Sequence, residues 1–169
     1  MVAMAFTMIV ISKASINRIV EVLNDTPDIP DFAEEDIEVA DGSIVFEQVS
    51  FSYHGDKDNC ALKDVSLNIA SGETVGIIGG TGSAKSSLVH LIPRLYEVTE
   101  GSVKVGGVDV RNYKQHTLRN QVAMVLQKNV LFTGTIKENL RWGNPKATDE
   151  ELIAACKAAQ ADEFIRSFP

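Results

Sequence analysis

Residues 79–87 read Gly-Gly-Thr-Gly-Ser-Ala-Lys-Ser-Ser, and this stretch decides the fold. It matches the pattern G-x-x-x-x-G-K-[ST], except that Ala84 stands in place of the second glycine. In such a loop the backbone N–H groups converge on an anion, and the helix that follows adds its N-terminal dipole. The sequence therefore predicts a phosphate-binding loop between a strand and a helix.

Each side chain at the end of this loop has a predicted task. Lys85 can reach the β- and γ-phosphates of a nucleotide, the Ser86 hydroxyl can hold Mg²⁺, and Ser87 can contact the α-phosphate. The alternative is an ordinary turn rich in small residues, which the Lys-Ser-Ser sequence disfavours. The loop residues predicted to bind nucleotide are Gly79, Gly80, Thr81, Gly82, Ser83, Ala84, Lys85, Ser86 and Ser87.

Ala84 is the unusual member of the loop. Glycine suits this place because it adopts a positive φ without a Cβ penalty. A positive φ at Ala84 would cost roughly 1–2 kcal/mol, whereas a negative φ would be harmless. Because the other loop residues are suitable, we expect the harmless outcome and intact ATP binding.

Apolar runs near the loop predict an α/β fold. Residues 74–78 and 122–126 are short apolar runs, as expected for parallel strands buried on both faces. An apolar helical stretch is expected from the loop towards Leu95. At Thr148, a capping box with Glu151 predicts a helix that turns Leu152, Cys156 and Ala159 inward.

A second group of segments predicts antiparallel strands. Residues 43–51 alternate between apolar and polar, with a slip near Gln48, and residues 65–69 alternate cleanly. Residues 102–110 predict a hairpin around Gly106-Gly107.

Length and composition limit the function classes. The chain has 169 residues, 44% of them hydrophobic and 23% charged, which is ordinary for a globular domain with an appendage. The net charge is −7, and eight of the 23 acidic residues lie in 24–41, so the rest is close to neutral. No basic stripe suggests nucleic-acid binding. Cys60 and Cys156 are too few for a disulfide scaffold, and neither belongs to a zinc motif.

The N-terminal part predicts a helix followed by a linker. Residues 1–11 are almost wholly apolar but too few to span a bilayer, which needs about 20 residues. A helical pattern continues to Leu23, so we expect one helix over residues 1–23. It is either a core helix of a soluble domain or the cytoplasmic end of a membrane helix. Residues 24–42 are acidic, contain two prolines and predict an extended, solvated linker.

Further motifs accompany the loop and point to a family. Tyr53 lies 26 residues before Gly79, in Phe51-Ser52-Tyr53. Val125-Leu126-Gln127 precedes Val130-Leu131-Phe132, and Gly134-Thr135-Ile136-Lys137-Glu138-Asn139-Leu140 follows. With the loop, these motifs resemble the nucleotide-binding domain of an exporter-type ATP-binding cassette (ABC) transporter. The resemblance runs from about Ser43 to Pro169, and residues 12–23 resemble the end of the last transmembrane helix.

The resemblance implies a phosphate-loop (RecA-like) core with an antiparallel β subdomain, incomplete at the C-terminus, and ATP and Mg²⁺ as ligands. It implies that Tyr53 stacks on adenine. It also implies that Gln127 is catalytic and, with Ser86, holds the metal. From the residues alone, Tyr53 could instead be a strand-end aromatic and Gln127 an exposed amide. Phe132 and Trp142 are expected to pack locally, although an interface role for Phe132 stays open.

The domain organisation and the function follow from the same resemblance. Residues 1–23 would be the cytoplasmic end of a transmembrane helix, 24–42 an acidic linker and 43–169 a partial nucleotide-binding domain. The whole protein would couple ATP binding and hydrolysis to export across the cell membrane. Its partners would be a transmembrane domain and a second nucleotide-binding domain, and no nucleic acid. The nucleotide-binding domain would lie on the cytoplasmic side.

Two departures from the family pattern bear on activity. Ala84 replaces a glycine, and the family's signature motif, Walker B aspartate, catalytic glutamate and switch histidine have no counterpart before Pro169. We therefore expect the chain by itself to be inactive as an ATPase. A non-catalytic nucleotide-binding fragment is one alternative. An unrelated phosphate-loop kinase is another, but it would have no reason to carry Tyr53 and Gln127 together.

Overall fold

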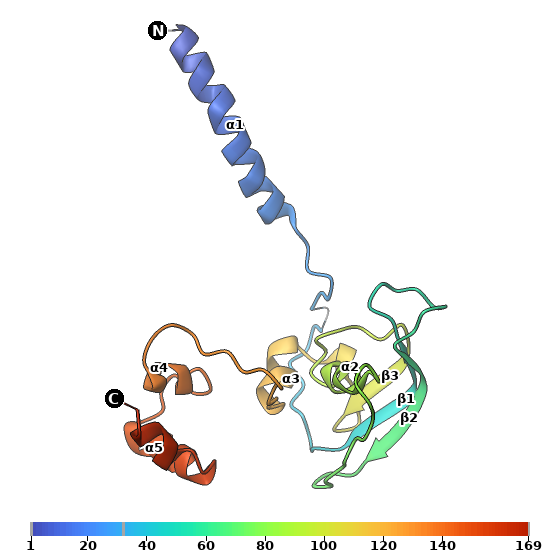
Figure 1. The fold of residues 1–169 in the computed structure, drawn as a ribbon. Coiled ribbons are helices and arrows are strands. Elements are labelled where there is room, and N and C mark those ends of the chain that lie inside the picture. Colours follow the sequence, from blue (N-terminus) through green and yellow to red (C-terminus); the bar gives the residue numbers. More distant parts are fainter. Residues whose placement is uncertain (1, 32, 169) are drawn as a thin grey trace. The chain divides into compact units, whose positions relative to one another are not determined.

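The computed structural model describes residues 2–31 and 33–168, which divide into two compact units. The first unit ends at Ala123 and contains α1 and an antiparallel sheet, and the second begins at Met124 and contains short helices (Figure 1). The phosphate loop belongs to the first unit and is followed directly by one of its helices.

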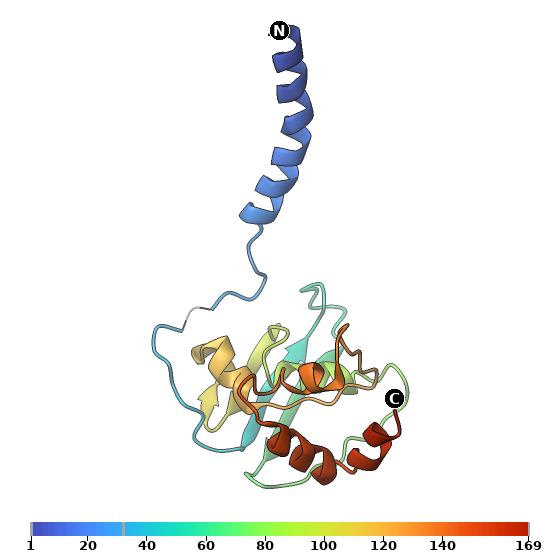
Figure 2. The same ribbon diagram turned by 90° about the vertical axis from the view of Figure 1, so that its left-hand side faces the viewer.

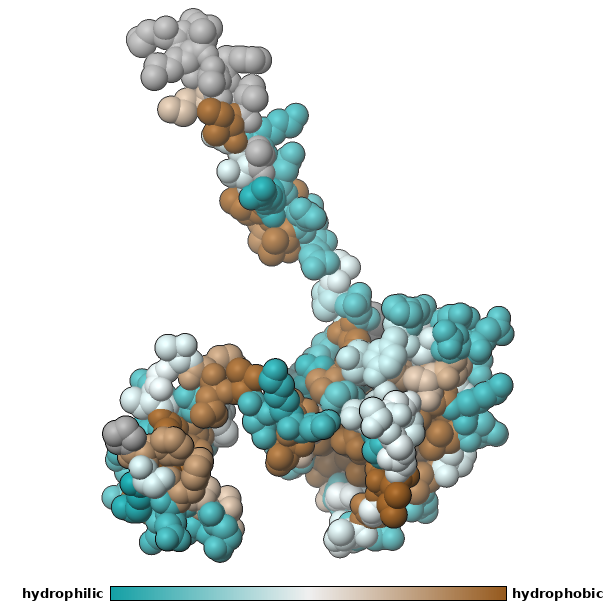
Figure 3. Space-filling model, viewed as in Figure 1, coloured by the Kyte–Doolittle hydropathy of each residue, from teal (hydrophilic) through white to brown (hydrophobic). Residues whose placement is uncertain are grey.

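Helix α1 spans Val2–Asn24 without a break, so the predicted N-terminal helix is confirmed. Ile16, Ile19 and Val20 are exposed on it. In Figure 3, apolar and polar side chains lie on opposite sides of the coloured part of this helix. Among the described residues, no helix combines the length and the hydropathy needed to cross a membrane. The assignment of residues 1–23 to the end of a membrane helix stays a prediction.

The sheet confirms the predicted antiparallel subdomain (Figure 2). Its strands are β1 (Ile44–Phe51), β2 (Leu62–Ile69), β3 (Glu100–Val105) and β4 (Val108–Asp109), in the order β2-β1-β3-β4. All neighbours are antiparallel. The predicted hairpin is the β3–β4 pair, whose turn is Gly106-Gly107 with positive φ at both residues.

The predicted slip near Gln48 is a β-bulge. Gln48 has a φ of 47°, and the register of β1 shifts at this residue against both neighbouring strands, β2 and β3. Gly101 lies opposite the bulge with a φ of 84°. A Cβ there would come within 2.4 Å of the carbonyl oxygens of Glu47 and Gln48, so only glycine fits.

The core of the first unit lies between the sheet and the helices α2 (Lys85–Leu91) and α3 (Gln115–Gln121). A short 3₁₀ turn, η1 (Val110–Asn112), precedes α3. The buried Tyr113 hydroxyl donates to the carbonyl oxygen of Val105 over 2.9 Å. The core side chains are Phe46, Val49, Phe51, Leu62, Leu91, Val103, Val105, Val110, Tyr113 and Leu118.

The two buried parallel strands predicted at 74–78 and 122–126 are not formed. Neither run pairs with another described segment, and Ile78 and Val125 are 99% and 92% exposed. A strand is defined by the hydrogen bonds it shares with a neighbour, and an apolar, β-branched composition does not supply that neighbour.

Helix α2 is shorter than the apolar pattern predicts, because Pro93 has no N–H with which to continue it. The N–H of Leu95 donates to the carbonyl of His90, and the N–H of Arg94 donates to that of Leu91. This is a Schellman ending, with Arg94 in the left-handed conformation at a φ of 52°.

The second unit contains α4 (Ile136–Leu140), α5 (Asp149–Ala158) and α6 (Asp162–Arg166). The capping box of Thr148 and Glu151 is confirmed, and Thr135 and Glu138 form a second one at α4. Leu152 and Cys156 are buried as predicted.

The sequence also predicts that Ala159 lies inward on α5 and that Phe132 and Trp142 pack locally. Ala159 is exposed, so its inward placement was wrong: α5 ends at Ala158 and the chain turns through Gln160 with a φ of 56°. The rings of Phe132 and Trp142 stack with centroids 4.7 Å apart, which confirms local packing.

Candidate nucleotide-binding site

The phosphate loop runs without regular structure from Gly79 to Ala84, and α2 begins at Lys85. The loop closes on itself, because the N–H and the hydroxyl of Ser83 both donate to the carbonyl of Gly80, over 3.3 and 2.8 Å. A Cβ at Gly79 would lie 2.5 Å from the Ser83 hydroxyl oxygen, so a larger residue there would force this hydroxyl away from its bond to Gly80.

Lys85 folds over this loop. Its Nζ donates to the carbonyl oxygens of Gly79 and Gly80, both over 2.7 Å, and to the hydroxyl of Ser83 over 3.1 Å. The ammonium group is therefore held within the loop, and its positive charge lies beside the N-terminus of α2. An anion at this place would meet both.

Ala84 adopts the strained conformation rather than the harmless one that the sequence favoured. Its φ is 58° and its ψ is 21°, in the left-handed region. The expectation of a harmless φ was therefore wrong, because the tight turn into α2 fixes the backbone there whatever the residue. The Cβ penalty is about 1–2 kcal/mol. The side chain packs against the core, which offsets part of it.

Tyr53 lies against the helix that follows the phosphate loop, although 34 residues separate it from Ser87. Its hydroxyl and that of Ser87 lie 2.7 Å apart and share a hydrogen bond. The ring meets Phe51 and Tyr96 edge to face, with centroid distances of 4.8 and 5.2 Å. More than half of Tyr53 is exposed, so an aromatic surface remains open beside the loop.

A groove of about 460 Å³ adjoins this aromatic cluster. Tyr53, Tyr96 and Phe51 line it, and Asp28 and Ile29 of the linker contribute to its wall. Sequence reasoning missed Tyr96 and the linker residues as neighbours of Tyr53. No motif marks them, since only the fold brings 28–29, 51–53 and 95–99 together.

Three further predicted site residues, Ser86, Ser87 and Gln127, lie in different surroundings. Ser86 is exposed in the first turn of α2, whereas Ser87 is only 5% exposed and is bonded to Tyr53. Gln127 is exposed and belongs to the second unit, so its place beside Ser86 stays a prediction. Within residues 2–31 and 33–168, no three His, Cys, Asp or Glu side chains are grouped to hold a metal by themselves.

Comparisons with known proteins identify the family to which this chain is similar. The sequence model of the family described as "ABC transporter" matches residues 62–169. A candidate multidrug export ATP-binding/permease protein of Bacillus subtilis, YgaD, is 54% identical over 128 residues, which are 76% of this chain and 22% of that protein. A protein of the same description from Staphylococcus aureus is 44% identical over 133 residues, 79% of this chain and 23% of its own length.

A solved structure is also similar. It is described as the structure of a bacterial Atm1-family ABC exporter with ATP bound, and it matches with a TM-score of 0.87 and 29% identity. The match covers 98% of this chain and 29% of the exporter chain. The chain thus spans about a quarter of the length of the proteins it resembles.

Proposed function

Because this chain belongs to the ABC transporter family, we propose that residues 79–87 bind the phosphates of ATP and that Tyr53 binds the adenine. The observation that carries the proposal is the hydrogen bond between Tyr53 and Ser87, which ties an exposed aromatic ring to the helix that begins at Lys85. ATP needs an apolar surface for its base beside an anion site for its phosphates. The ring of Tyr53 offers the first, and the loop that ends at Lys85 offers the second.

The exposed hydroxyl of Ser86, next to Lys85 in the chain, is an oxygen donor of the kind that Mg²⁺ takes. This ion keeps several waters and usually takes one or two protein oxygens together with substrate phosphates. The exposed hydroxyl of Ser86 is one proposed ligand, and the side-chain oxygen of Gln127 is the other. The bound ion would neutralise negative charge on the phosphates. Gln127 is further proposed to orient the attacking water.

At the level of the whole protein, we propose that ATP binding and hydrolysis drive the export of a substrate across a membrane. Residues 1–23 would end a transmembrane helix, 24–42 would link it to the cytoplasmic side, and 43–169 would form part of a RecA-like nucleotide-binding domain. A transmembrane domain and a second nucleotide-binding domain are the proposed partners. The 169 residues alone would bind nucleotide without turnover, since none of the proposed site residues is a carboxylate that could activate water.

Lys85→Ala tests the phosphate part of the proposal. The charge-assisted bonds to phosphate are worth about 1.5–3 kcal/mol, so calorimetric titration with ATP and Mg²⁺ should show at least about a tenfold loss of affinity. Lys63→Ala is the control, because Lys63 is an exposed lysine of β2. Equal affinities for the wild type and Lys85→Ala would remove the loop from the site.

Tyr53→Ala tests the base part. It should weaken ATP binding but leave the affinity for inorganic triphosphate unchanged, because triphosphate has no base to stack. Tyr53→Phe keeps the ring and should retain most of the affinity for ATP. A parallel loss for ATP and triphosphate in Tyr53→Ala would show that Tyr53 only supports the loop.

A further inference from the structure

The linker between α1 and β1 is anchored rather than free. Its sequence predicts a solvated segment, and residues 25–31 and 33–43 form no helix or strand. Nevertheless Ile29 and Pro30 are half-buried, and Ile37 and Val39 pack against the core of the first unit. The acidic side chains between Pro30 and Val39 remain exposed. The apolar residues therefore anchor the linker, and the acidic residues give it its negative charge.

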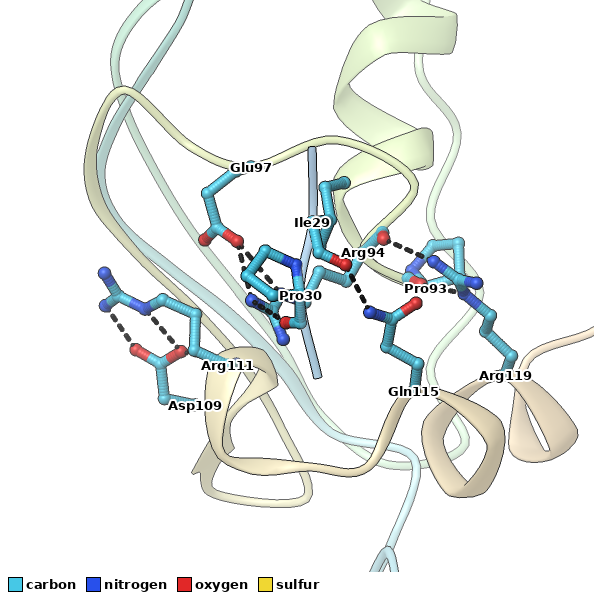
Figure 4. A network of polar contacts seen from close by, with 9 residues as sticks. All are labelled: Ile29, Pro30, Pro93, Arg94, Glu97, Asp109, Arg111, Gln115 and Arg119. Carbon is cyan, nitrogen blue, oxygen red and sulfur yellow. Dashed lines mark hydrogen bonds and ion pairs between the residues drawn. The ribbon is translucent and has the colours of Figure 1, made fainter. Parts of the chain in front are cut away.

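Polar contacts from α3 and from the end of α2 hold this segment (Figure 4). Gln115 Nε2 donates to the carbonyl of Ile29 over 2.7 Å, and Arg94 Nη2 donates to the carbonyl of Pro30 over 3.4 Å. The hydroxyl of Thr117 donates to Asp36, and this bond lowers the pKa of the Asp36 carboxyl. Main-chain carbonyls are thus held by side chains from two separate elements.

Arg94 is an unusual residue for its place. Position C′ of a Schellman ending is most often glycine, because the backbone is left-handed there. Arg94 is also only 4% exposed, and its Nη1 has no hydrogen-bond partner among the described residues. Its bonds to Glu97 and to Pro30 therefore compensate for the burial of the guanidinium. Arg119 fixes the same turn by donating to the carbonyls of Pro93 and Arg94.

Gln160 occupies the same C′ position of a helix ending, but no linker contact has been described for it. It follows α5 in the same Schellman arrangement, with a φ of 56°. Gln160 is exposed, and its side chain makes only a 3.5 Å contact with the carbonyl of Lys157. A helix ending of this kind therefore does not need a large buried side chain. The contacts of Arg94 with Glu97 and Pro30 are not required to form the turn.

We propose that Arg94, Gln115 and Thr117 form a linker clamp that makes the linker and the end of α2 move together. Helix α2 has seven residues and is about 10 Å long. Arg94 lies just beyond one end and Lys85 at the other, so a displacement of the linker is passed to the phosphate loop. Arg94 is a positioning residue in this scheme. The connection between the clamp and nucleotide binding rests on the proposed function, whereas the mechanical connection between the linker and α2 does not.

The first test uses the double variant Gln115→Ala/Thr117→Val, which removes two clamp bonds and leaves Arg94 and the core intact. A glutamate-specific protease should cut after Glu34 and Glu35 about tenfold faster than in the wild type, because cleavage follows the open population of the linker. Hydrogen exchange in the peptide 90–96 should rise at least about threefold at the same time. Exchange in β1 should not change.

Two matched controls accompany this variant. Arg111→Ala removes an ion pair with Asp109 of 2.6 Å in the same region, and neither residue forms a hydrogen bond or ion pair with a described linker residue (Figure 4). Gln160→Gly relieves the same backbone conformation as Arg94→Gly without touching the clamp. Arg94→Gly should free the linker, whereas both controls should leave its cleavage unchanged. Unchanged cleavage in the double variant overturns the clamp, and faster cleavage with unchanged exchange at 90–96 overturns the connection to α2.

The second test adds ATP and Mg²⁺ at concentrations that calorimetry shows to be saturating for each variant. ATP should slow linker cleavage in the wild type about threefold or more and have no effect on it in the double variant. If calorimetry detects no ATP binding in the wild type, the proposed function fails and the first test still decides the clamp. If ATP binds but cleavage is unchanged, the connection to the nucleotide site is wrong.

Discussion

The strands of the antiparallel sheet and the apolar segments 74–78 and 122–126 both contain β-branched apolar residues, but they differ in structure. β1 pairs on both sides, with β2 and with β3, and buries Phe46 and Val49. The two apolar segments contain valine, as β1 does, but they share no ladder of backbone hydrogen bonds with another described segment. Antiparallel neighbours can be joined by a short turn, as β3 and β4 are, whereas parallel strands always need a long crossover before they can pair. Apolar composition alone thus does not make a strand.

Phe46→Ala should break the paired region most severely. Phe46 is 2% exposed in the core beneath the sheet, and removing such a side chain costs about 3–5 kcal/mol. Val75→Ala, at a residue that is 40% exposed in the unpaired region, should cost less than about 1 kcal/mol. Urea unfolding followed by far-ultraviolet circular dichroism measures both. Equal losses would mean that the segment 74–78 is packed as tightly as β1.

Gly101→Ala and Gly76→Ala compare one glycine from each region. At Gly101 a Cβ would strike two carbonyl oxygens with the backbone at a φ of 84°, so we expect a loss of about 2–3 kcal/mol. At Gly76 a Cβ would meet nothing within 4 Å, and we expect a change below about 1 kcal/mol. The same unfolding assay applies. A tolerant Gly101 would show that the bulge can relax.

Ala84→Gly moves the comparison to the phosphate loop. Relief of the left-handed strain, about 1–2 kcal/mol, exceeds the entropic cost of glycine, so the variant should gain about 0.5–1 kcal/mol. ATP affinity should rise by no more than about tenfold. Ala61→Gly, at an alanine outside the left-handed region, should lose stability instead. A gain of much more than tenfold in affinity would show that the present loop is impaired.

The smallest effect concerns acid sensitivity of the sheet. Hydrogen bonds from Lys104 and Ser102 lower the pKa of Glu47 below its ordinary value of 4.5. The ionised Glu47 therefore stabilises the folded state fully above the pKa that it has in the unfolded chain. This stabilisation is lost as the pH falls through the lower pKa that Glu47 has in the folded state. Urea midpoints between pH 6 and pH 3 should fall less steeply in Glu47→Gln than in the wild type. Parallel curves would exclude Glu47 from the acid response.

Local signals were the part of the fold that could be predicted from the sequence. The bulge at Gln48, the Gly106-Gly107 hairpin and the Thr148 capping box each depend on a few neighbouring residues, and all three are present. The strands at 74–78 and 122–126 depend on partners far along the chain, and both predictions failed. The conformation of Ala84 failed for a related reason, since the turn rather than the residue sets φ.

The candidate site divides in the same way. Lys85 and the loop glycines are recognisable from their spacing alone, and the structure places them in one compact turn. The bond from Tyr53 to Ser87 is not predictable from spacing, because the fold has to bring β1 against α2. The sequence did not mark Arg94 either, since its contact with the linker is made to the carbonyl of Pro30, 64 residues earlier.

The two capping boxes of the second unit have a consequence for how relatives can diverge. Thr135 with Glu138 and Thr148 with Glu151 complete their hydrogen bonds within three positions of each other. The starting residue of each helix is therefore set without reference to any surface the unit packs against. Substitutions on the outer faces of α4 and α5 can adapt this unit to different neighbours while its helices keep the same register.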